Sequence, residues 1–244
     1  MAVTELTPAV AAPEQKGLLA RIVGVIFSPR ATYASVAAYP RWFGVLLTVA
    51  LLASGGAFAF MSTDVGKQAW LDAAVRQQES FGRTMTDQQY DTLEKMSTYA
   101  PYISAISVVV LPVMTVVTAA VLLGVFNALL GGDASFKQVF AIVAHSTVLL
   151  PVAQVVALPI AYARETLSGV TNLMIFFPFL DENSFAARFL GAVDLIYVWW
   201  IVSLAIGVAV LYKRRTGSIA MSLFAVYAVV AFVIAAIKTA YAGA

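Results

Sequence analysis

The chain has 244 residues, of which 61% are hydrophobic and only 11% are charged. Soluble domains carry roughly a quarter charged residues, so this composition excludes an ordinary soluble protein. The net charge of +2 is too small to indicate a nucleic-acid partner. Cys is absent, which excludes disulfides and thiolate metal sites. The opening residues MAVTELTPAVAA have neither a basic start nor an apolar core, so no cleavable signal peptide is expected.

Five stretches contain no Lys, Arg, Asp or Glu, and the shortest of them has 18 residues. About 20 apolar residues are needed to cross the hydrocarbon core of a membrane. The sequence therefore predicts an all-α integral membrane protein, a five-helix transmembrane bundle. Its predicted spans lie at about 42–61, 101–130, 138–163, 189–212 and 218–241.

The segments outside the spans are of three kinds. Residues 1–16 are expected to form a flexible tail, because they lack a periodic apolar face. Residues 17–40 have apolar residues at helical spacing and a Ser28-Pro29 helix start, which predicts N-terminal amphipathic helices lying at the membrane interface. An amphipathic pair packed on the bundle is an equal alternative. Residues 64–95 form a polar outer loop, and 166–180 a loop or interfacial hairpin.

Orientation is predicted from the basic residues in short loops, which favour the cytoplasmic side. With the N-terminus inside, eight Lys and Arg residues lie in short inner segments, whereas seven lie on the outside in longer ones. The predicted location is the cell (inner, cytoplasmic) membrane, with the N-terminus cytoplasmic and the C-terminus outside. The basic residues expected to meet lipid headgroups at the membrane surface are Arg21, Arg30, Arg41, Lys213, Arg214 and Arg215.

Two stretches are distinctive in their order and spacing: GGDASFKQVFAIVAHSTVLLP at 131–151 and FLGAVDLIYVWW at 189–200. With the opening FSPRATYASVAAYPRW they resemble the bacterial branch of the Yip family, five-span membrane proteins named for eukaryotic members that interact with Ypt/Rab GTPases. The resemblance implies one membrane domain over 17–241. Eukaryotic members carry a D-L-Y-G-P-type motif before the first span, where this chain has YPRWFG. That difference argues against a Rab-type GTPase partner.

Four polar side chains fall inside the predicted spans: Asn127, His145, Gln154 and Asp194. Such groups are costly in lipid, so they are expected to face the bundle interior or a cavity. At 1.5 Å per helical residue, Asp194 and Gln154 share one depth, about 15 Å from His145. We therefore expect Asp194 to pair with Gln154, or with Arg188 or Arg164 at the outer rim, and we expect no His–Asp proton relay.

His145 is the only histidine. In one interpretation its neutral ring is hydrogen-bonded to a helix carbonyl or hydroxyl in a packed bundle. In the other it handles protons or a ligand in a cavity lined by helices that Pro112, Pro151 and Pro159 distort. Gly55, Gly56 and Gly207 are predicted sites of close helix contact, either within the chain or between chains.

Catalytic motifs are not matched. One histidine cannot supply H-E-x-x-H, Asp194 has no second buried Asp, and no Gly-rich phosphate loop is present. The sequence predicts a non-enzymatic protein without cofactor or metal that organises the membrane or recruits partners. Its expected contacts are membrane lipids and either a membrane-protein partner or a second copy. A small transporter, channel or lipid-handling subunit with a cavity near His145 is the alternative.

Overall fold

The computed structural model describes residues 14–181 and 183–242, and the regular elements within these ranges are helices. In chain order the α-helices are α1 (Leu18–Phe27), α2 (Pro29–Ala38), α3 (Phe43–Met61), α4 (Asp64–Glu79), α5 (Asp87–Ser97), α6 (Ala100–Ala105), α7 (Ser107–Leu123), α8 (Phe136–Ser146), α9 (Leu149–Ala163), α10 (Phe185–Ala192), α11 (Leu195–Leu211) and α12 (Thr216–Ala242). A π-helical turn, Gly124–Leu129, continues α7. A 3₁₀ turn, Leu173–Phe176, lies between α9 and α10.

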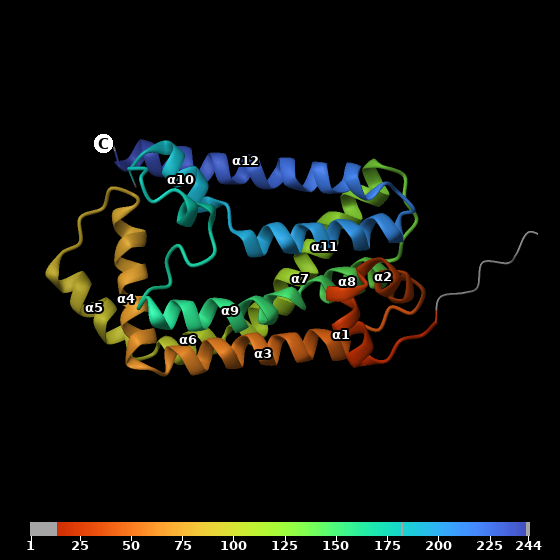
Figure 1. The fold of residues 1–244 in the computed structure, drawn as a ribbon, viewed down its shortest axis with the longest axis horizontal. Coiled ribbons are helices and arrows are strands. Elements are labelled where there is room, and N and C mark those ends of the chain that lie inside the picture. The colour runs from red at the N-terminus through yellow and green to blue at the C-terminus, as the bar shows by residue number, and fades with distance from the viewer. Residues whose placement is uncertain (1–13, 182, 243–244) are drawn as a thin grey trace, which may run out of the picture.

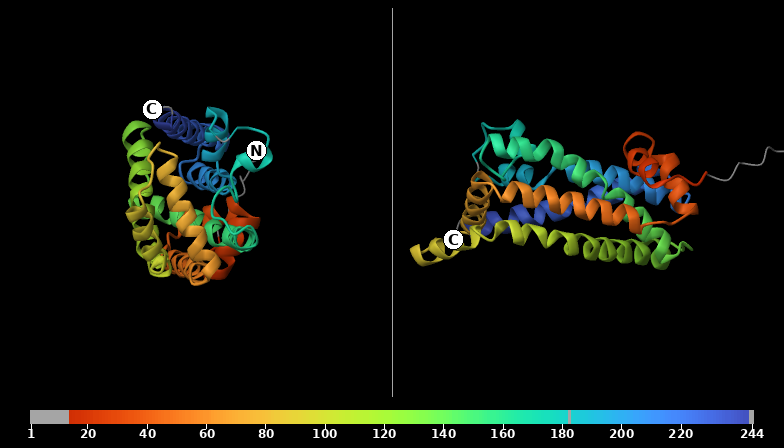
Figure 2. Two further views of the ribbon diagram at one scale, coloured as in Figure 1. Left: turned by 90° about the vertical axis from the view of Figure 1, so that its left-hand side faces the viewer. Right: turned by 90° about the horizontal axis from the view of Figure 1, so that it is seen from below.

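The long helices run side by side, and short helices close the two ends of the bundle (Figure 1). The helices α1 and α2 lie at one end, which we call the α1–α2 end. The helices α4 and α5 lie at the opposite end, the α4–α5 end, where α12 also ends. Figure 2 shows α5 projecting beyond the long helices there.

Four helical runs are long and apolar enough to cross a membrane: Phe43–Met61, Ala100–Leu129, Phe136–Ala163 and Thr216–Tyr241. The fifth, α11, has 17 residues, the lower limit for a transmembrane helix. The protein is thus an all-α, multi-pass membrane protein, as its composition predicts.

The run Phe136–Ala163 is the centre of the bundle. Over an apolar stretch of 18 residues in this run 67% is buried, against 17% in Ala100–Leu129 and in Thr216–Tyr241. Its first half, α8, packs against α1, α2, α3, α7 and α11. The peripheral helices α7 and α12 instead leave most of their apolar side chains outward, where lipid would cover them.

The helix predicted over 189–212 is interrupted in the structure. Val193 and Asp194 adopt extended conformations between α10 and α11. The backbone there pairs with the preceding loop, because Leu173 N–H donates to the Val193 carbonyl and Leu195 N–H to the Thr171 carbonyl, both at 2.9 Å. Hydropathy does not distinguish this break from a continuous helix, because the residues on both sides are apolar.

The N-terminal region packs more closely than the predicted tail and surface helices suggest. Backbone and side-chain atoms of residues 14–16 contact α2: the Ser35 hydroxyl donates to the Glu14 carbonyl at 2.7 Å, and Lys16 Nζ donates to the Thr32 hydroxyl at 3.2 Å. Residues 1–13 lie outside the described residues. The helices α1 and α2 pack on the bundle, while Leu19 and Phe27 of α1 stay 76% and 80% exposed. One face of α1 thus belongs to the protein, and its apolar opposite face is free to meet lipid.

Two of the three glycines predicted at close helix contacts lie at such contacts. A Cβ on Gly207 would come within 2.5 Å of Ile142 Cγ2, where α11 crosses α8. A Cβ on Gly56 would come within 3.0 Å of Gln154 Oε1, where α3 meets α9. Gly55 has nothing within 4 Å of its Cβ position, so it makes no close contact within the chain, and a contact with a second chain stays a prediction.

Because Gly207 is tightly packed and Gly55 is not, replacing each by Ala should change the stability of the protein differently. We expect Gly207→Ala to destabilise the bundle by about 1–3 kcal/mol, because the added methyl group overlaps Ile142 and Tyr33 in a filled core. Gly55→Ala, the matched control, should be neutral or stabilise by up to about 1 kcal/mol through helix propensity. Thermal unfolding of both purified variants in detergent measures this, and equal effects would contradict the assigned packing.

Candidate functional site

The candidate site is built on α8, which begins with a double cap. The Ser135 hydroxyl accepts from the Gln138 N–H, and the Gln138 side chain accepts from the Ser135 N–H in return. The Gln138 amide also donates to the Ala37 carbonyl at 3.1 Å, which ties α8 to the end of α2. Near the other end, Pro151 has no N–H for the Thr147 carbonyl. These local features set where α8 begins and ends and tie its start to α2.

His145 is completely buried on α8, with a relative exposure of 0%. Its Nδ1 lies 2.7 Å from the Ala141 carbonyl one turn earlier, and its Nε2 lies 3.2 Å from Nη1 of Arg21. Arg can only donate a hydrogen bond, so Nε2 must be the acceptor and Nδ1 carries the proton. The ring is therefore a neutral Nδ1–H tautomer whose two nitrogens are both occupied. This is the arrangement that the packing interpretation describes.

The prediction that Arg21 meets lipid headgroups is wrong, because its side chain is buried in the bundle. It lies on the inner face of α1 with 7% exposure, and Nη1 also donates to the carbonyl of Arg41. Burial, and secondarily the like charge of Arg41, lowers the pKa of Arg21. The reason for its position is the α1–α2 packing, which turns the Arg21, Gly24 and Val25 face toward the bundle. The other five basic residues expected at the membrane surface are exposed.

Further hydroxyl contacts link the neighbouring helices to this centre. Tyr33 of α2 lies 2.7 Å from the Ser203 hydroxyl of α11, and Trp200 Nε1 donates to the Ser146 hydroxyl at 2.9 Å. Burial raises the pKa of the Tyr33 hydroxyl, and its hydrogen bond with Ser203 acts weakly in the opposite direction. Each of these polar groups has a partner from another helix. Together they hold α2, α8 and α11 in one register.

Asp194 does not make the contacts expected of it. One carboxylate oxygen accepts from the Ile196 N–H at 2.7 Å and caps α11, while the other accepts from the Thr171 hydroxyl at 2.5 Å. Its backbone N–H donates to the Tyr227 hydroxyl at 2.9 Å. The predicted pairing is wrong because Asp194 lies before α11 rather than within it, and an N-cap carboxylate is used by its own helix.

Gln154 and Asn127 each link two elements. The Gln154 amide donates to the Ala53 carbonyl of α3 at 3.2 Å, beside the small residue Gly56. The Asn127 amide donates to the Ala134 carbonyl at 2.7 Å, and its oxygen accepts from the Tyr212 hydroxyl at 2.8 Å. Asn127 thereby joins the π-helical turn, the following linker and the end of α11. Both side chains hold the backbone in place.

A basic basin at the α4–α5 end is a feature that the sequence interpretation missed. Two adjoining hollows of about 580 and 650 Å³ share Arg76 and Lys238; Arg188 lines the first and Arg164 the second. Arg76 donates to Thr166 and Ser168 at 3.2 Å each, so it also anchors the 166–180 loop. The four residues come from different elements, so only their tertiary arrangement brings them together. The only signal in the sequence was their common side of the membrane.

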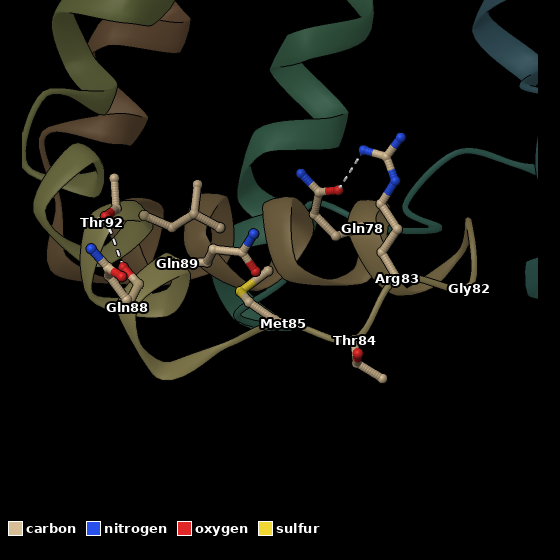
Figure 3. Close-up of a pocket in the computed structure, with 9 residues that line it drawn as sticks. Gln78, Gly82, Arg83, Thr84, Met85, Gln88, Gln89 and Thr92 are labelled. Carbon is tan, nitrogen blue, oxygen red and sulfur yellow. Dashed lines mark hydrogen bonds between the residues drawn. The ribbon is translucent and has the colours of Figure 1, made fainter.

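A third hollow of about 700 Å³ lies between α4 and α5 (Figure 3). Its labelled side chains are mostly uncharged and polar, and Arg83 is directed toward Gln78 at 3.5 Å. They come from the end of α4, the connecting loop and the start of α5, where Thr86 and Gln89 form a capping box. The hollow is open and carries no group of catalytic residues.

The described residues hold no group of three or more His, Cys, Asp or Glu side chains that could bind a metal ion. Within the same part of the chain, the ion pair is Lys67 with Asp64, 3.8 Å apart on the surface of α4. The buried centre is thus held by hydrogen bonds rather than by paired charges. These hydrogen bonds fix how the helices pack and how they are oriented.

The Arg21–His145 contact can be tested by its energetics. We expect Arg21→Met to destabilise the protein by about 1–3 kcal/mol, because it leaves His145 Nε2 and the Arg41 carbonyl unpaired. Arg30→Met on the exposed face of α2 is the control and should change stability by less than about 0.5 kcal/mol. In a double-mutant cycle with His145→Phe, measured by chemical unfolding in detergent, the coupling should be about 0.5–3 kcal/mol. Additive effects would show that the two side chains do not interact.

The family model of the Yip1 domain matches residues 23–237, which include the helices α2 to α11 in full and most of the last span, Thr216–Tyr241. No curated protein and no solved structure matches the chain. The match covers far more than half of the 244 residues. The chain therefore belongs to the Yip family of membrane proteins, as the 131–151 and 189–200 stretches indicated.

Proposed function

We propose that the protein is a non-catalytic component of the cell membrane that organises the membrane or recruits other proteins to it. The observation that carries this proposal is the closed centre around His145. A transporter or channel that used this residue would need it to face a cavity, whereas the ring is fully buried with both nitrogens bonded. Protonating Nε2 would also require Arg21 to leave, since a protonated ring has no acceptor. These features weigh against the transporter alternative.

The helices α4 and α5 supply the proposed partner surface. The helix α5 projects beyond the long helices while α4 lies across their end, and we call α5 with the adjoining end of α4 the arm (Figure 2). The hollow between them is lined by amide, hydroxyl and apolar side chains and by Arg83 (Figure 3). The helix α5 has no buried residue, so individual side chains on it can be changed without disturbing the packing of the protein. An exposed arm of this kind can contact another protein without disturbing the spans.

The orientation belongs to the same proposal. The α1–α2 end carries Arg30, Arg41 and the turn 213–215, and short segments with this charge are retained in the cytoplasm. We therefore place the α1–α2 end in the cytoplasm and the α4–α5 arm outside. Five crossings would put the two described ends of the chain on opposite sides of the membrane, and in the structure these ends lie at opposite ends of the bundle (Figure 1).

The partner proposal predicts a protein that co-purifies through the arm. We expect a tagged chain, extracted from native membranes in mild detergent, to bring down one membrane or extracytoplasmic protein at near-equal amounts. Gln88→Arg with Thr92→Arg, both exposed on α5, should reduce that recovery at least tenfold. Arg30→Gln at the opposite end is the control. A chain that elutes alone, or with a bound solute, would contradict recruitment and favour the transporter alternative.

The orientation is tested by labelling single cysteines, which is possible because the chain has none. A membrane-impermeant maleimide should label Gln88→Cys on intact cells. It should label Arg30→Cys only after the membrane is opened. The reverse pattern would invert the assigned topology without affecting the partner experiment.

A further inference from the structure

A groove on the lipid-facing side of the bundle separates α12 from α7 and the π-helical turn. It encloses about 500 Å³ near the α1–α2 end. It exists because the two walls pack on different partners: α12 packs on α10 and α11, whereas α7 packs on α3 and α8. Leu122, Phe126 and Ile219 form its floor and are buried in the protein. The groove is therefore a fixed feature of the bundle surface.

The walls of the groove are apolar. Val121 and Val226, on opposite walls, are 59% and 63% exposed, and both face the space between the helices. The Ser222 hydroxyl donates to the Ser218 carbonyl at 3.1 Å, so it needs no partner from a ligand. A mainly apolar channel of this kind suits a hydrocarbon chain.

Its length corresponds to one leaflet. From Ser218 to Val226 along α12 the rise is about 12 Å. Half of the hydrocarbon core of a bilayer is about 15 Å thick. The groove starts at the turn 213–215, where α11 ends and α12 begins, so it runs from the membrane surface toward the midplane.

Two arginines stand at the mouth of the groove. Arg214 Nη donates to the Leu130 carbonyl at 3.3 Å, which holds the guanidinium between the two walls. Arg215, the last residue before α12, also lines the groove, and both arginines are exposed. Neither forms an ion pair within the described residues; Asp133 lies in an adjoining hollow with Lys213 and Arg214. The mouth is thus positively charged, and among the described residues no carboxylate is ion-paired with either arginine.

We propose that this groove binds an anionic phospholipid of the adjacent leaflet. One acyl chain lies between α7 and α12, and the headgroup phosphate is held by Arg214 and Arg215. Arg guanidinium and phosphate form bidentate, charge-assisted hydrogen bonds, and basic sites between transmembrane helices on the cytoplasmic side suit such headgroups. A helix from a second copy fits less well, because its apolar surface would cover two arginines and leave their charges buried and unpaired.

The first test measures stabilisation by lipid. The full chain is unfolded thermally in phosphatidylcholine micelles with increasing phosphatidylglycerol, since a ligand that binds only the folded state raises the Tm. We expect a saturable rise in Tm for the natural chain. The rise should fall by at least half in Arg214→Gln/Arg215→Gln and in Val226→Phe, which fills the groove without changing charge. Lys213→Gln, in the same turn but outside the groove, is the control and should keep the full rise.

Three results would overturn the proposal. The first is an equal response to phosphatidylglycerol in all four proteins. The second is the same rise in Tm with water-soluble glycerol phosphate, which would mean a phosphate site that needs no acyl chain. The third concerns occupancy: Ser222→Cys, the sole cysteine of that variant, would form disulfide-linked dimers if a second copy filled the groove. Phosphatidylglycerol with a photoreactive acyl chain should instead cross-link to α12 and to residues 121–130.

Discussion

The structure depends on burying residues 139–146 of α8, which include the polar side chains of His145 and Ser146, inside a membrane protein. A polar group in such a place must find its partner inside the protein, because lipid offers none. His145 meets this demand with the carbonyl of Ala141 and with Arg21, and Ser146 meets it with Trp200. The consequence is that α1, α2 and α11 are each oriented by a bond to α8 or to a neighbour of α8. The N-terminal helices are therefore part of the bundle and not an accessory on its surface.

Much of the fold could be predicted because a helix that crosses lipid needs an uninterrupted apolar stretch, which is visible directly in the sequence. Long stretches without charge specify spans, and Ser28-Pro29 marks a helix start that the structure contains at Pro29. The break before α11 could not be read in this way. It depends on hydrogen bonds between Asp194 and the 166–180 loop, and these involve distant parts of the chain rather than local apolar character.

The candidate site was predictable in its residues but only partly in their contacts. Depth along a helix can be calculated from sequence, but the rotation of a helix about its axis cannot, and the rotation decides which side chains meet. Asp194 and Gln154 share a depth and still bind different partners. Arg21 and His145 lie 124 positions apart, and nothing in either segment indicates their contact. Exposed charge was easier to recognise: the basic turn 213–215 is at the surface as expected.

The interruption at residues 193–194 also affects the membrane around the protein. With 17 residues, α11 offers about 25 Å of continuous apolar helix, against about 30 Å for an average hydrocarbon core. Tyr197 and Trp199 near its start are 52% and 38% exposed, so lipid meets this shortened side directly. A bilayer accommodates such hydrophobic mismatch by thinning locally, at a fraction of a kcal/mol per Å. A protein with one short face and long faces elsewhere imposes an uneven thickness on its surroundings, and several copies in one membrane would share, and be drawn to, the same thinned region.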